Sequence, residues 1–476
     1  MASIHRFSII VFVGLIALAV GMAPAGAVDI RLGTAAVKIN PPNGTPLAGY
    51  YGARGSQGVL DDIFAKAAVF DDGKTKAAIV VCDLIGIPRT PVLEARQLIE
   101  AKTGIPAANV MISATHTHTG PMVVGDTAID DLVAEGSKLN QDYTAQLPNW
   151  IAQAVEEAAG RLAAARVSYG RENEPNLSFI RRFWMKDGTI GWNPGKLNPN
   201  IIRPIGVIDP QVNVVYAESA DKKPLLTCVN FANHLDTTGG MLISADYPCA
   251  LARSLAEHKG PEMLTIFANG ACGNINHVDV TSGVPQGSPA EAKRIGMVLA
   301  ASVLKAYLHL TDVEDATLRV RREVVELAPA KFTDEELRIA RDIVAKRGKG
   351  ASFLEQVKAY RVVDDAARDG KPFDVDVQIF SLGRDIAWVA LPGEVFVELG
   401  LSIKAASPFR QTNVIELANG RSGYLPNHSA FSEGQYEVVS TRYAEGSGEQ
   451  LVSAALRLMY ELHREATATQ TPAAPK

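Results

Sequence analysis

The pattern of hydrophobic and polar positions predicts strands that alternate with helices along most of the chain. Apolar, β-branched runs bounded by Gly, Pro or Asn predict strands at residues 30–37, 64–70, 76–84, 110–114, 225–231, 264–268, 375–382 and 385–391. Apolar residues at helical spacing predict helices at residues 90–103, 142–165 and 289–306. Strands interleaved with helices of this length indicate an α/β or α+β fold.

Residues 334–369 have a different composition, rich in Glu, Lys, Arg and Ala at helical spacing. We interpret them as a surface insertion of one or two helices whose charged face is solvated. No internal repeat and no clear linker divides the chain. We therefore expect one large domain over residues 28–465, built on a large mixed sheet with flanking helices.

The two ends of the chain differ from this domain. Arg6 is followed by an apolar run over residues 7–22 and by Ala25-Gly26-Ala27, the pattern of a secretory signal peptide over residues 1–27. The run is shorter than the roughly 20 apolar residues that a spanning helix needs. We expect export to the periplasm or the extracellular medium. Residues 466–476 are rich in Ala, Thr and Pro and are predicted to be a disordered tail.

Charge and cysteine content narrow the function. With 47 basic and 52 acidic residues, the net charge of −5 gives no electrostatic reason to expect nucleic-acid binding. Only four cysteines occur and none forms a C-x-x-C pair, so a disulfide framework does not hold the protein together. Cys82 and Cys228 lie in apolar runs and are predicted to be buried. Cys249 and Cys272 could form one disulfide in an oxidising compartment or remain thiols.

The scarce histidines point to a site at the ends of strands. Among nine in all, His116 and His118 directly follow the strand predicted at residues 110–114. Side chains at i and i+2 of an extended segment point the same way, so both can face one site. This spacing alone leaves open a metal site and a pair of hydrogen-bonded structural histidines.

Two further polar residues follow buried strands. His234 comes after residues 225–231, and Glu394 comes after residues 385–391 in a Pro-Gly turn. Two histidines, one carboxylate and an open position for water form a frequent catalytic zinc shell. The combination predicts a zinc hydrolase more strongly than either histidine motif does alone. The glycines of residues 269–277 could allow close approach to substrate or serve a tight turn.

Taken in order, these motifs resemble the neutral (non-lysosomal) ceramidase family. The resemblance extends over most of residues 30–460 and rests on Gly33 to Pro42 with Gly49-Tyr50, Cys82-Asp83, Thr115 to Pro121, His234 with Ser244 to Pro248, Asn269 to His277, Pro392-Gly393-Glu394, Gly423-Tyr424, and Gln435-Tyr436-Glu437. It implies a secreted zinc-dependent amidohydrolase that releases a fatty acid from a sphingoid or similar amine.

The resemblance also implies roles for individual residues. One zinc ion per chain would be held by His116, His234, Glu394 and Tyr424. The groups that face the scissile carbonyl would be His118 and Tyr436, and the substrate-binding arginine would be Arg181 or Arg182. On this reading zinc activates a water molecule that attacks the amide carbonyl.

Two departures from the family bear on the substrate. Asn276 stands where the family has an active-site serine, and because an amide cannot act as a nucleophile, water must attack. The family's C-terminal immunoglobulin-like domain has no counterpart after about residue 465. A small amphiphilic or N-acyl substrate is therefore expected. The alternatives are another ester or N-acyl substrate, lipid or sugar, or a non-catalytic exported lipid- or glycan-binding protein. Peripheral membrane contact and oligomeric state stay open.

Overall fold

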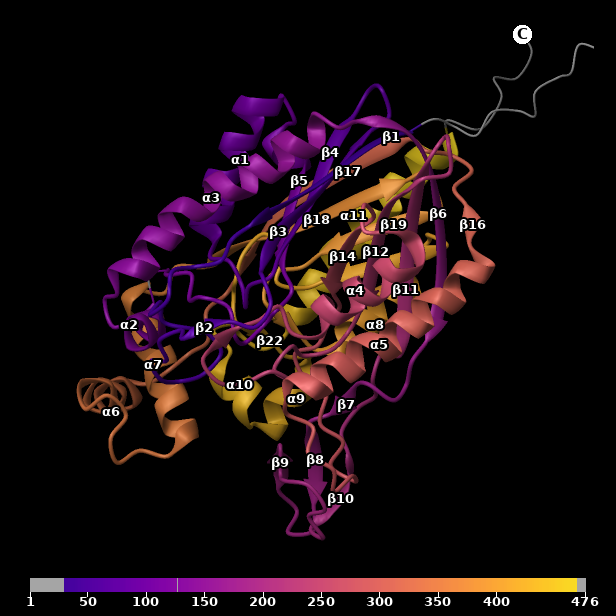
Figure 1. Cartoon of the computed structure of the whole chain (residues 1–476). Coiled ribbons are helices and arrows are strands. Elements are labelled where there is room, and N and C mark those ends of the chain that lie inside the picture. The colour runs from indigo at the N-terminus through magenta and orange to yellow at the C-terminus, as the bar shows by residue number, and fades with distance from the viewer. Residues whose placement is uncertain (1–29, 126, 469–476) are drawn as a thin grey trace, which may run out of the picture.

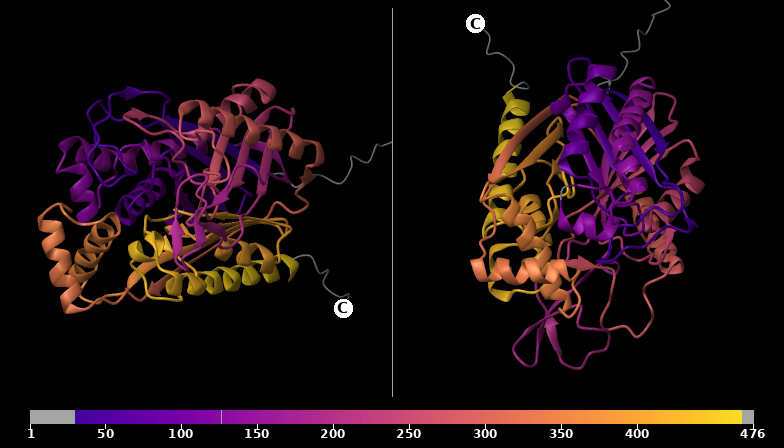
Figure 2. Two further views of the ribbon diagram at one scale, coloured as in Figure 1. Left: turned by 90° about the horizontal axis from the view of Figure 1, so that it is seen from below. Right: turned by 90° about the vertical axis from the view of Figure 1, so that its left-hand side faces the viewer.

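The structure is a computed structural model that describes residues 30–125 and 127–468. Two β-sheets lie face to face, and helices cover the outer face of each sheet (Figures 1 and 2). The expected single α/β domain with a large mixed sheet and flanking helices is confirmed. The predicted signal peptide lies outside the described residues.

The larger sheet has nine strands, of which eight form one continuous path. Along that path they are β14 (Leu264–Asn269), β12 (Pro224–Phe231), β11 (Gln211–Ser219), β6 (Ala163–Asn173), β1 (Ile30–Lys38), β3 (Phe64–Asp71), β4 (Lys76–Cys82) and β5 (Val110–Ala114). The ninth, β16 (Thr311–Asp312), pairs with β6. The pairs β12–β14 and β4–β5 are parallel and the others antiparallel.

The second sheet has four strands and packs against the first. Its order is β17 (Leu318–Leu327), β18 (Phe373–Leu382), β19 (Ile386–Ala390) and β21 (Gln411–Ile415). Large side chains from both sheets, such as Phe70 and Trp388, fill the space between them at a ring separation of 5.8 Å. No helix of the described residues lies between the two sheets. The helices pack on the outer faces of the sheets instead.

Strand β4 shows why the sequence forms two layers. Its Ala78 and Val80 face helices, whereas Ile79 and Val81 face the second sheet. All four side chains are buried, because successive residues of a strand point to opposite faces. A strand covered on both sides therefore has a continuous apolar sequence.

The helices cover three areas. Helices α1 (Arg89–Thr103) and α3 (Lys138–Ala159) pack on one half of the larger sheet. Helices α4 (Tyr247–Lys259) and α5 (Pro289–Ala306) pack on its other half. The second sheet is covered by α8 (Val397–Ala406) and α11 (Ser447–Ala468). None of the helices in the described ranges is long and apolar enough to cross a membrane.

Some predicted boundaries differ from the structure, which also decides the open question of a disulfide between Cys249 and Cys272. The helix predicted at residues 142–165 ends at Ala159, because Gly160 closes it and Ala163–Asn173 is strand β6. Helix α11 continues through Ala468, so the predicted tail begins too early. Cys249 and Cys272 are both free thiols, while Cys82 and Cys228 are buried as expected. The bridge between Cys249 and Cys272 does not form because each thiol faces a different carboxylate, Asp61 and Glu416.

The insertion at residues 334–369 forms two helices, α6 (Asp334–Ala345) and α7 (Phe353–Ala367). Each begins with a capping box, in which a Thr or Ser side chain and a Glu satisfy the first backbone N–H groups. The insertion forms two helices as expected, but α7 also has a buried face. Its Val357 and Val362 are buried, and the helix packs beside α2 (Ala128–Ala134) and α10 (Tyr436–Ser440).

Candidate metal centre

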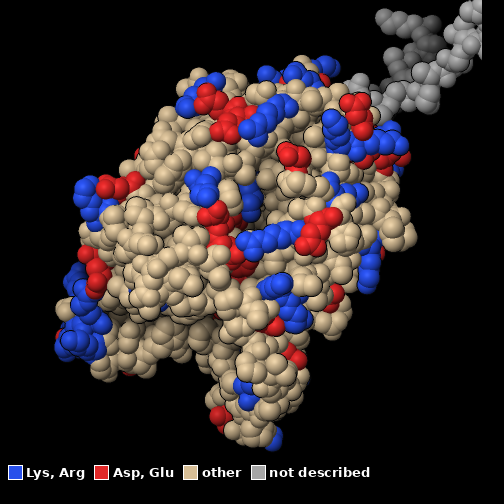
Figure 3. Space-filling view, viewed as in Figure 1, with Lys and Arg blue, Asp and Glu red and all other residues tan. Residues whose placement is uncertain are grey.

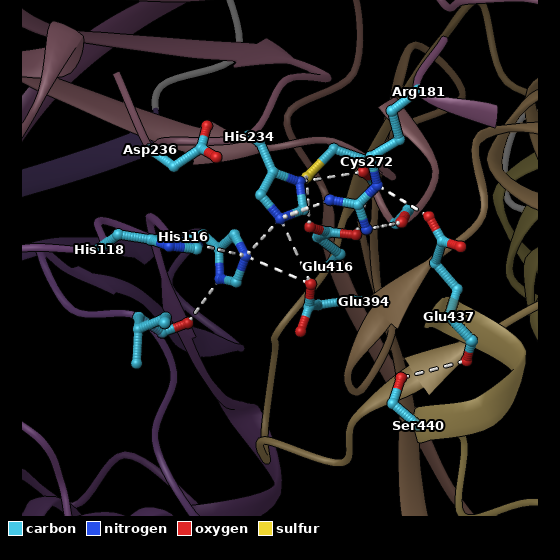
Figure 4. Close-up of polar contacts among 12 residues, drawn as sticks. His116, His118, Arg181, His234, Asp236, Cys272, Glu394, Glu416, Glu437 and Ser440 are labelled. Carbon is cyan, nitrogen blue, oxygen red and sulfur yellow. Dashed lines mark hydrogen bonds and ion pairs between the residues drawn. The ribbon is translucent and has the colours of Figure 1, made fainter. Parts of the chain in front are cut away.

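The two ends of the larger sheet meet at the candidate site. Strands β5 and β14 stand at opposite ends of the strand order, yet Asn269 at the end of β14 donates a hydrogen bond to Thr115 O, just after β5, at 3.2 Å. The sheet must curl to allow this contact. Residues that follow β5, β12 and β19 thereby reach one point (Figure 4).

His116 enters the site through a backbone turn. Its φ of 81° lies in the left-handed region, which a residue with a side chain adopts only when its surroundings hold it there. Its N–H donates to Leu84 O at 2.8 Å, and its Nδ1 lies 2.9 Å from Ile85 O. The expected extended His-Thr-His segment is therefore wrong in conformation, although both histidines still face the site.

The rings of His116 and His234 are oriented for a cation. His234 Nδ1 lies 3.2 Å from Cys272 O, as His116 Nδ1 lies beside Ile85 O. A carbonyl only accepts hydrogen bonds, so each Nδ1 carries a proton, and each Nε2 presents a lone pair when its ring is neutral. The two Nε2 atoms are 3.1 Å apart. Two lone pairs at this distance repel each other unless a metal ion or a proton lies between them. Burial disfavours such a proton, but the charge of Glu394 raises the pKa of His116 to about 9.

Glu394 adds a carboxylate to the same point. Its Oε2 lies 3.3 Å from His116 Nε2 and 3.5 Å from His234 Nε2. This buried oxygen has no hydrogen-bond partner among the described residues. Burial opposes ionisation, but the charge of a protonated His116 holds the pKa of Glu394 at about 2. The donor set of two imidazoles and a carboxylate fits a zinc ion.

Tyr424 reaches Glu394 through a short pair of strands. Strands β20 (Glu394–Val395) and β22 (Tyr424–Leu425) pair in parallel and place these two residues opposite each other. Tyr424 is buried, hydrogen-bonds to Glu394, and has a raised pKa, chiefly because of burial. The structure thus brings together all four residues to which the resemblance assigns zinc: His116, His234, Glu394 and Tyr424.

His118 lies against the same group. Its Nε2 is 3.4 Å from His116 Nε2, and one nitrogen from each of the three histidines lies within 4.8 Å of the others. Burial, followed by the charge of His116, lowers the pKa of His118 to about 4. Gly49 permits this position, because a Cβ there would lie 2.7 Å from His118 Cβ. This geometry allows both a ligand role and a carbonyl-facing role.

The two candidate arginines point to different places. Arg181 NH1 lies 3.3 Å from His234 Nε2, and its NH2 donates to Gly273 O at 2.5 Å. Arg182 instead donates to Gly434 O at 3.0 Å and to Glu433 at 2.9 Å. Successive residues on an extended segment point to opposite sides, so only Arg181 reaches the centre.

Asn276 is held by its own turn. Its Nδ2 donates to Asn193 at 3.0 Å, and its Oδ1 accepts from Val278 N–H at 2.9 Å. The nearby Gly273 is needed for close packing on the Glu394 strand, since a Cβ there would lie 2.6 Å from Glu394 O. The glycine therefore serves backbone packing next to a metal-site residue rather than approach to substrate.

Three acidic groups at the site were not predicted from the sequence. Glu416 accepts hydrogen bonds from the N–H groups of Cys272 and Val395, both at 3.0 Å. It thereby ties together the loops beside His234 and Glu394. Glu416 directly follows the apolar strand β21, the same signal that identified Glu394. Burial raises its pKa to about 7.

The second group, Glu437, bridges both arginines. Its carboxylate lies 2.8 Å from Arg181 Nε and 2.7 Å from Arg182 NH1. The third, Asp236, lies 2.9 Å from His277 Nδ1 and stands beside the histidines in Figure 4. The sequence offered one signal for each: Glu437 directly follows Tyr436, and Asp236 lies two residues after His234.

A cavity of about 280 Å³ opens from this centre. At one end it is lined by His116, His118, Glu394, Tyr424 and Tyr436. Its walls are mixed, with apolar side chains from α2 and α7 beside several charged groups. The described residues that line it do not include Asn276, Arg182, Arg181 or His234. The arrangement can hold a cation and place a polar, partly apolar molecule against it.

Comparisons with known proteins relate this architecture to solved structures. No protein-family model matches the chain, and no curated protein matches its sequence. The crystal structure of neutral ceramidase from Pseudomonas aeruginosa has a TM-score of 0.74 and 21% identity, over 92% of this chain and 75% of that chain. A ceramidase complexed with C2 has a TM-score of 0.73 and 20% identity, over 94% and 77%. The chain therefore has the fold of the neutral ceramidases.

Proposed function

We propose that the chain is a zinc-dependent hydrolase that cleaves the amide bond of an N-acyl compound, as a ceramidase does. The observation that carries this proposal is the convergence of two histidine lone pairs on the unpartnered Oε2 of Glu394. The fold of the neutral ceramidases supports it. His116, His234, Glu394 and Tyr424 would hold one zinc ion, which supplies Lewis-acid activation of water and of a carbonyl.

Tyr436 is the best-placed hydrogen-bond donor of the chain for a developing oxyanion. It lines the cavity and hydrogen-bonds to Tyr424 and Tyr51. Burial raises its pKa to about 12, so the hydroxyl keeps its proton at neutral pH. His118, whose lowered pKa keeps it neutral, would be a second group facing the carbonyl. Such donors contribute a few kcal/mol each, on the order of 3, to a transition state.

Arg181 would keep the site positively charged on the side of His234. It is fully buried, and its charge is balanced by Glu437 at 2.8 Å. Its guanidinium also lies over the ring of Tyr424, 5.4 Å from the centroid. The arginine therefore orients Tyr424 without itself lining the cavity.

The engaged amide of Asn276 favours a substrate other than ceramide itself. Asn276 offers no nucleophile, and both ends of its side chain already have partners. A different N-acyl compound or an ester is the second candidate. A non-catalytic lipid- or glycan-binding protein is less favoured, because a site without catalysis gains nothing from four converging zinc-type ligands.

The experiment that tests the proposal is a hydrolysis assay with zinc-loaded protein on short N-acyl amides and esters, combined with metal analysis. His118→Ala separates the two roles of His118: we expect retained zinc and a lower kcat. Loss of the metal in that variant would make His118 a ligand. Absence of amide and ester hydrolysis by a zinc-loaded protein would refute the hydrolase assignment.

We also propose that the protein is exported, on the strength of the signal-like pattern at residues 1–27. N-terminal sequencing of the mature protein should begin at Val28. Recovery of the full-length chain from the cytoplasmic fraction would contradict export.

A further inference from the structure

The cavity has a second end that the proposed chemistry does not use. There Arg89, Arg361, Arg421 and Arg442 line the same space as the metal-centre residues. We call these four residues the arginine end. They come from α1, α7 and two loops, so segments far apart in the sequence supply one kind of charge.

A neighbouring hollow increases this concentration of arginine. Its volume is about 300 Å³, and it is lined by Arg89, Arg421 and Arg442 together with Arg368. Arg89, Arg421 and Arg442 therefore line both the cavity and this hollow. On the outer face shown in Figure 3, by contrast, basic and acidic side chains are interspersed. The clustering of arginine is a feature of the cavity rather than of that surface.

Among the described side chains, the aspartates are outnumbered by the arginines that contact them. Asp130, which pairs with Arg421 at 2.7 Å, and Asp364 line the cavity beside the four arginines. Behind the wall, Asp365 contacts Arg361 and Arg442. Asp376 contacts Arg89 and is shared with the further arginines Arg96 and Arg322. Counted with Arg96 and Arg322, six arginines face four aspartates, which leaves positive charge in excess among the described side chains.

Several guanidinium N–H groups have no acceptor among the described residues. Arg361 is about nine-tenths buried, and its Nε has no hydrogen-bond partner. Arg442 Nε donates a hydrogen bond to Asp365, and Arg89 Nη1 donates one to Asp376. A guanidinium has five N–H donors, so most donors of this end stay available. Buried donors without acceptors are costly unless a ligand supplies the acceptor.

We propose that the arginine end binds an anionic group of the substrate, such as a carboxylate, while the scissile amide lies at the metal centre. This inference rests on the hydrolase function proposed above. The planar fork of arginine matches a carboxylate or phosphate with two parallel hydrogen bonds. The preferred substrate is then an N-acyl compound whose released amine carries an acid, which ceramide does not.

Matched probes test this inference directly. N-hexanoyl derivatives of glycine, β-alanine, 4-aminobutyrate and 6-aminohexanoate place a carboxylate at increasing distance from the amide. Each is compared with the N-hexanoyl alkylamine of the same length. We expect kcat/KM at the best length to be at least about tenfold higher for the anionic member. Equal kcat/KM for both members at every length would overturn the inference.

Arg89→Gln is the sharpest variant, because Asp376 keeps its contacts with Arg96 and Arg322. We expect the preference for the anionic probe to fall toward one in this variant, and Arg89→Lys to restore part of it. The control is Arg338→Gln on α6, whose arginine is exposed and pairs only with Glu335 at the surface. A preference that persists in Arg89→Gln and Arg442→Gln would contradict the assignment.

A binding measurement separates this inference from the hydrolase proposal. Calorimetry on chelator-treated protein compares 6-acetamidohexanoate with N-hexylacetamide, so no turnover is needed. We expect the carboxylate to bind at least about tenfold more tightly in the wild type, and not in Arg89→Gln. If zinc-loaded protein hydrolyses no probe, the hydrolase proposal fails. The calorimetry still tests the anion site, because equal affinities for 6-acetamidohexanoate and N-hexylacetamide would refute it.

Discussion

The two ends of the cavity are built in opposite ways. At the metal centre, residues follow strands of the curled sheet and of the second sheet, and the shortest distances between ligand atoms are 3.1 to 3.5 Å. At the arginine end, most contacts come from helices and loops, including the inserted α7. Lone pairs and a carboxylate converge at the first end, whereas N–H donors are in excess at the second.

This difference indicates that the two ends of the cavity have different functions. Strand ends are fixed by hydrogen bonds on both sides, so they hold ligand atoms in the geometry that chemistry requires. Helical insertions vary more freely, so they can change which molecules enter without disturbing the centre. We infer that the first end determines the reaction and the second determines the substrate.

Removing a residue of the metal centre should have the largest effect. His116→Ala deletes an imidazole whose Nε2 is within 3.5 Å of His234 Nε2, His118 Nε2 and Glu394 Oε2. We expect loss of bound zinc and a fall in kcat/KM of at least about 10⁴-fold, because metal activation supplies much of the rate. Metal analysis and hydrolysis assays measure both. His258→Ala, at an exposed position on α4, should change neither. Activity that survives complete loss of zinc would contradict the account.

The buried charge network behind the centre should govern stability. Glu437→Gln leaves Arg181 uncompensated and removes one of two carboxylates from Arg182. We expect the free energy of unfolding to fall by about 3 kcal/mol, because a buried charge has lost its partner. Urea denaturation measures this change. The matched control, Glu335→Gln, breaks an exposed pair with Arg338 and should leave the free energy of unfolding almost unchanged. Equal costs for the two variants would show that the network is not needed.

Loss of the proposed oxyanion donor should reduce the rate without removing the metal. Tyr436→Phe keeps the ring contacts with Trp192 and Tyr424 but deletes the hydroxyl. We expect kcat to fall roughly 100-fold, with KM and zinc content little changed. Steady-state kinetics together with metal analysis test this. An unchanged kcat would mean that Tyr436 only packs the loop.

Asp364, beside the arginine end, has a raised pKa, in contrast to Glu394. Burial raises the pKa of Asp364 to about 6, although its Oδ1 accepts a hydrogen bond from Ala128 N–H at 2.6 Å. The folded pKa exceeds the unfolded one, so the folded state binds the proton more tightly. The wild type should therefore lose stability as pH rises from about 4 to 6, by at most about 3 kcal/mol.

Asp364→Asn provides the comparison, because it keeps an oxygen for Ala128 N–H and cannot titrate. Urea denaturation at pH 4 and pH 6.5 should show a smaller decline for the variant than for the wild type. Parallel declines in the two proteins would assign the pH dependence to other groups.

Much of the architecture could be predicted from the sequence, because strands buried on both faces have continuous apolar runs. Strand β5 and helix α5 were predicted at their observed boundaries. Helix α3 was not, since alanines at its end suit a helix or a strand, and pairing of β6 with β1 and β11 decides the outcome.

The site was predictable only in part, because tertiary packing again decides what the local sequence leaves open. His116, His234, Glu394 and Tyr424 each belong to a recognisable motif, and the fold brings them together. The choice between Arg181 and Arg182 depended on which side of an extended segment each occupies. The role of α7 depended on packing against α2 and α10, which no local pattern in a charged helix reveals.

The most direct test of the central claim is a zinc titration of chelator-treated wild-type protein, with hydrolysis of an N-acyl probe followed at each addition. The account predicts that activity returns in proportion to zinc and reaches its maximum at one ion per chain. Full amide hydrolysis before any zinc is added, or a protein that binds one zinc ion and cleaves no N-acyl compound, would contradict it.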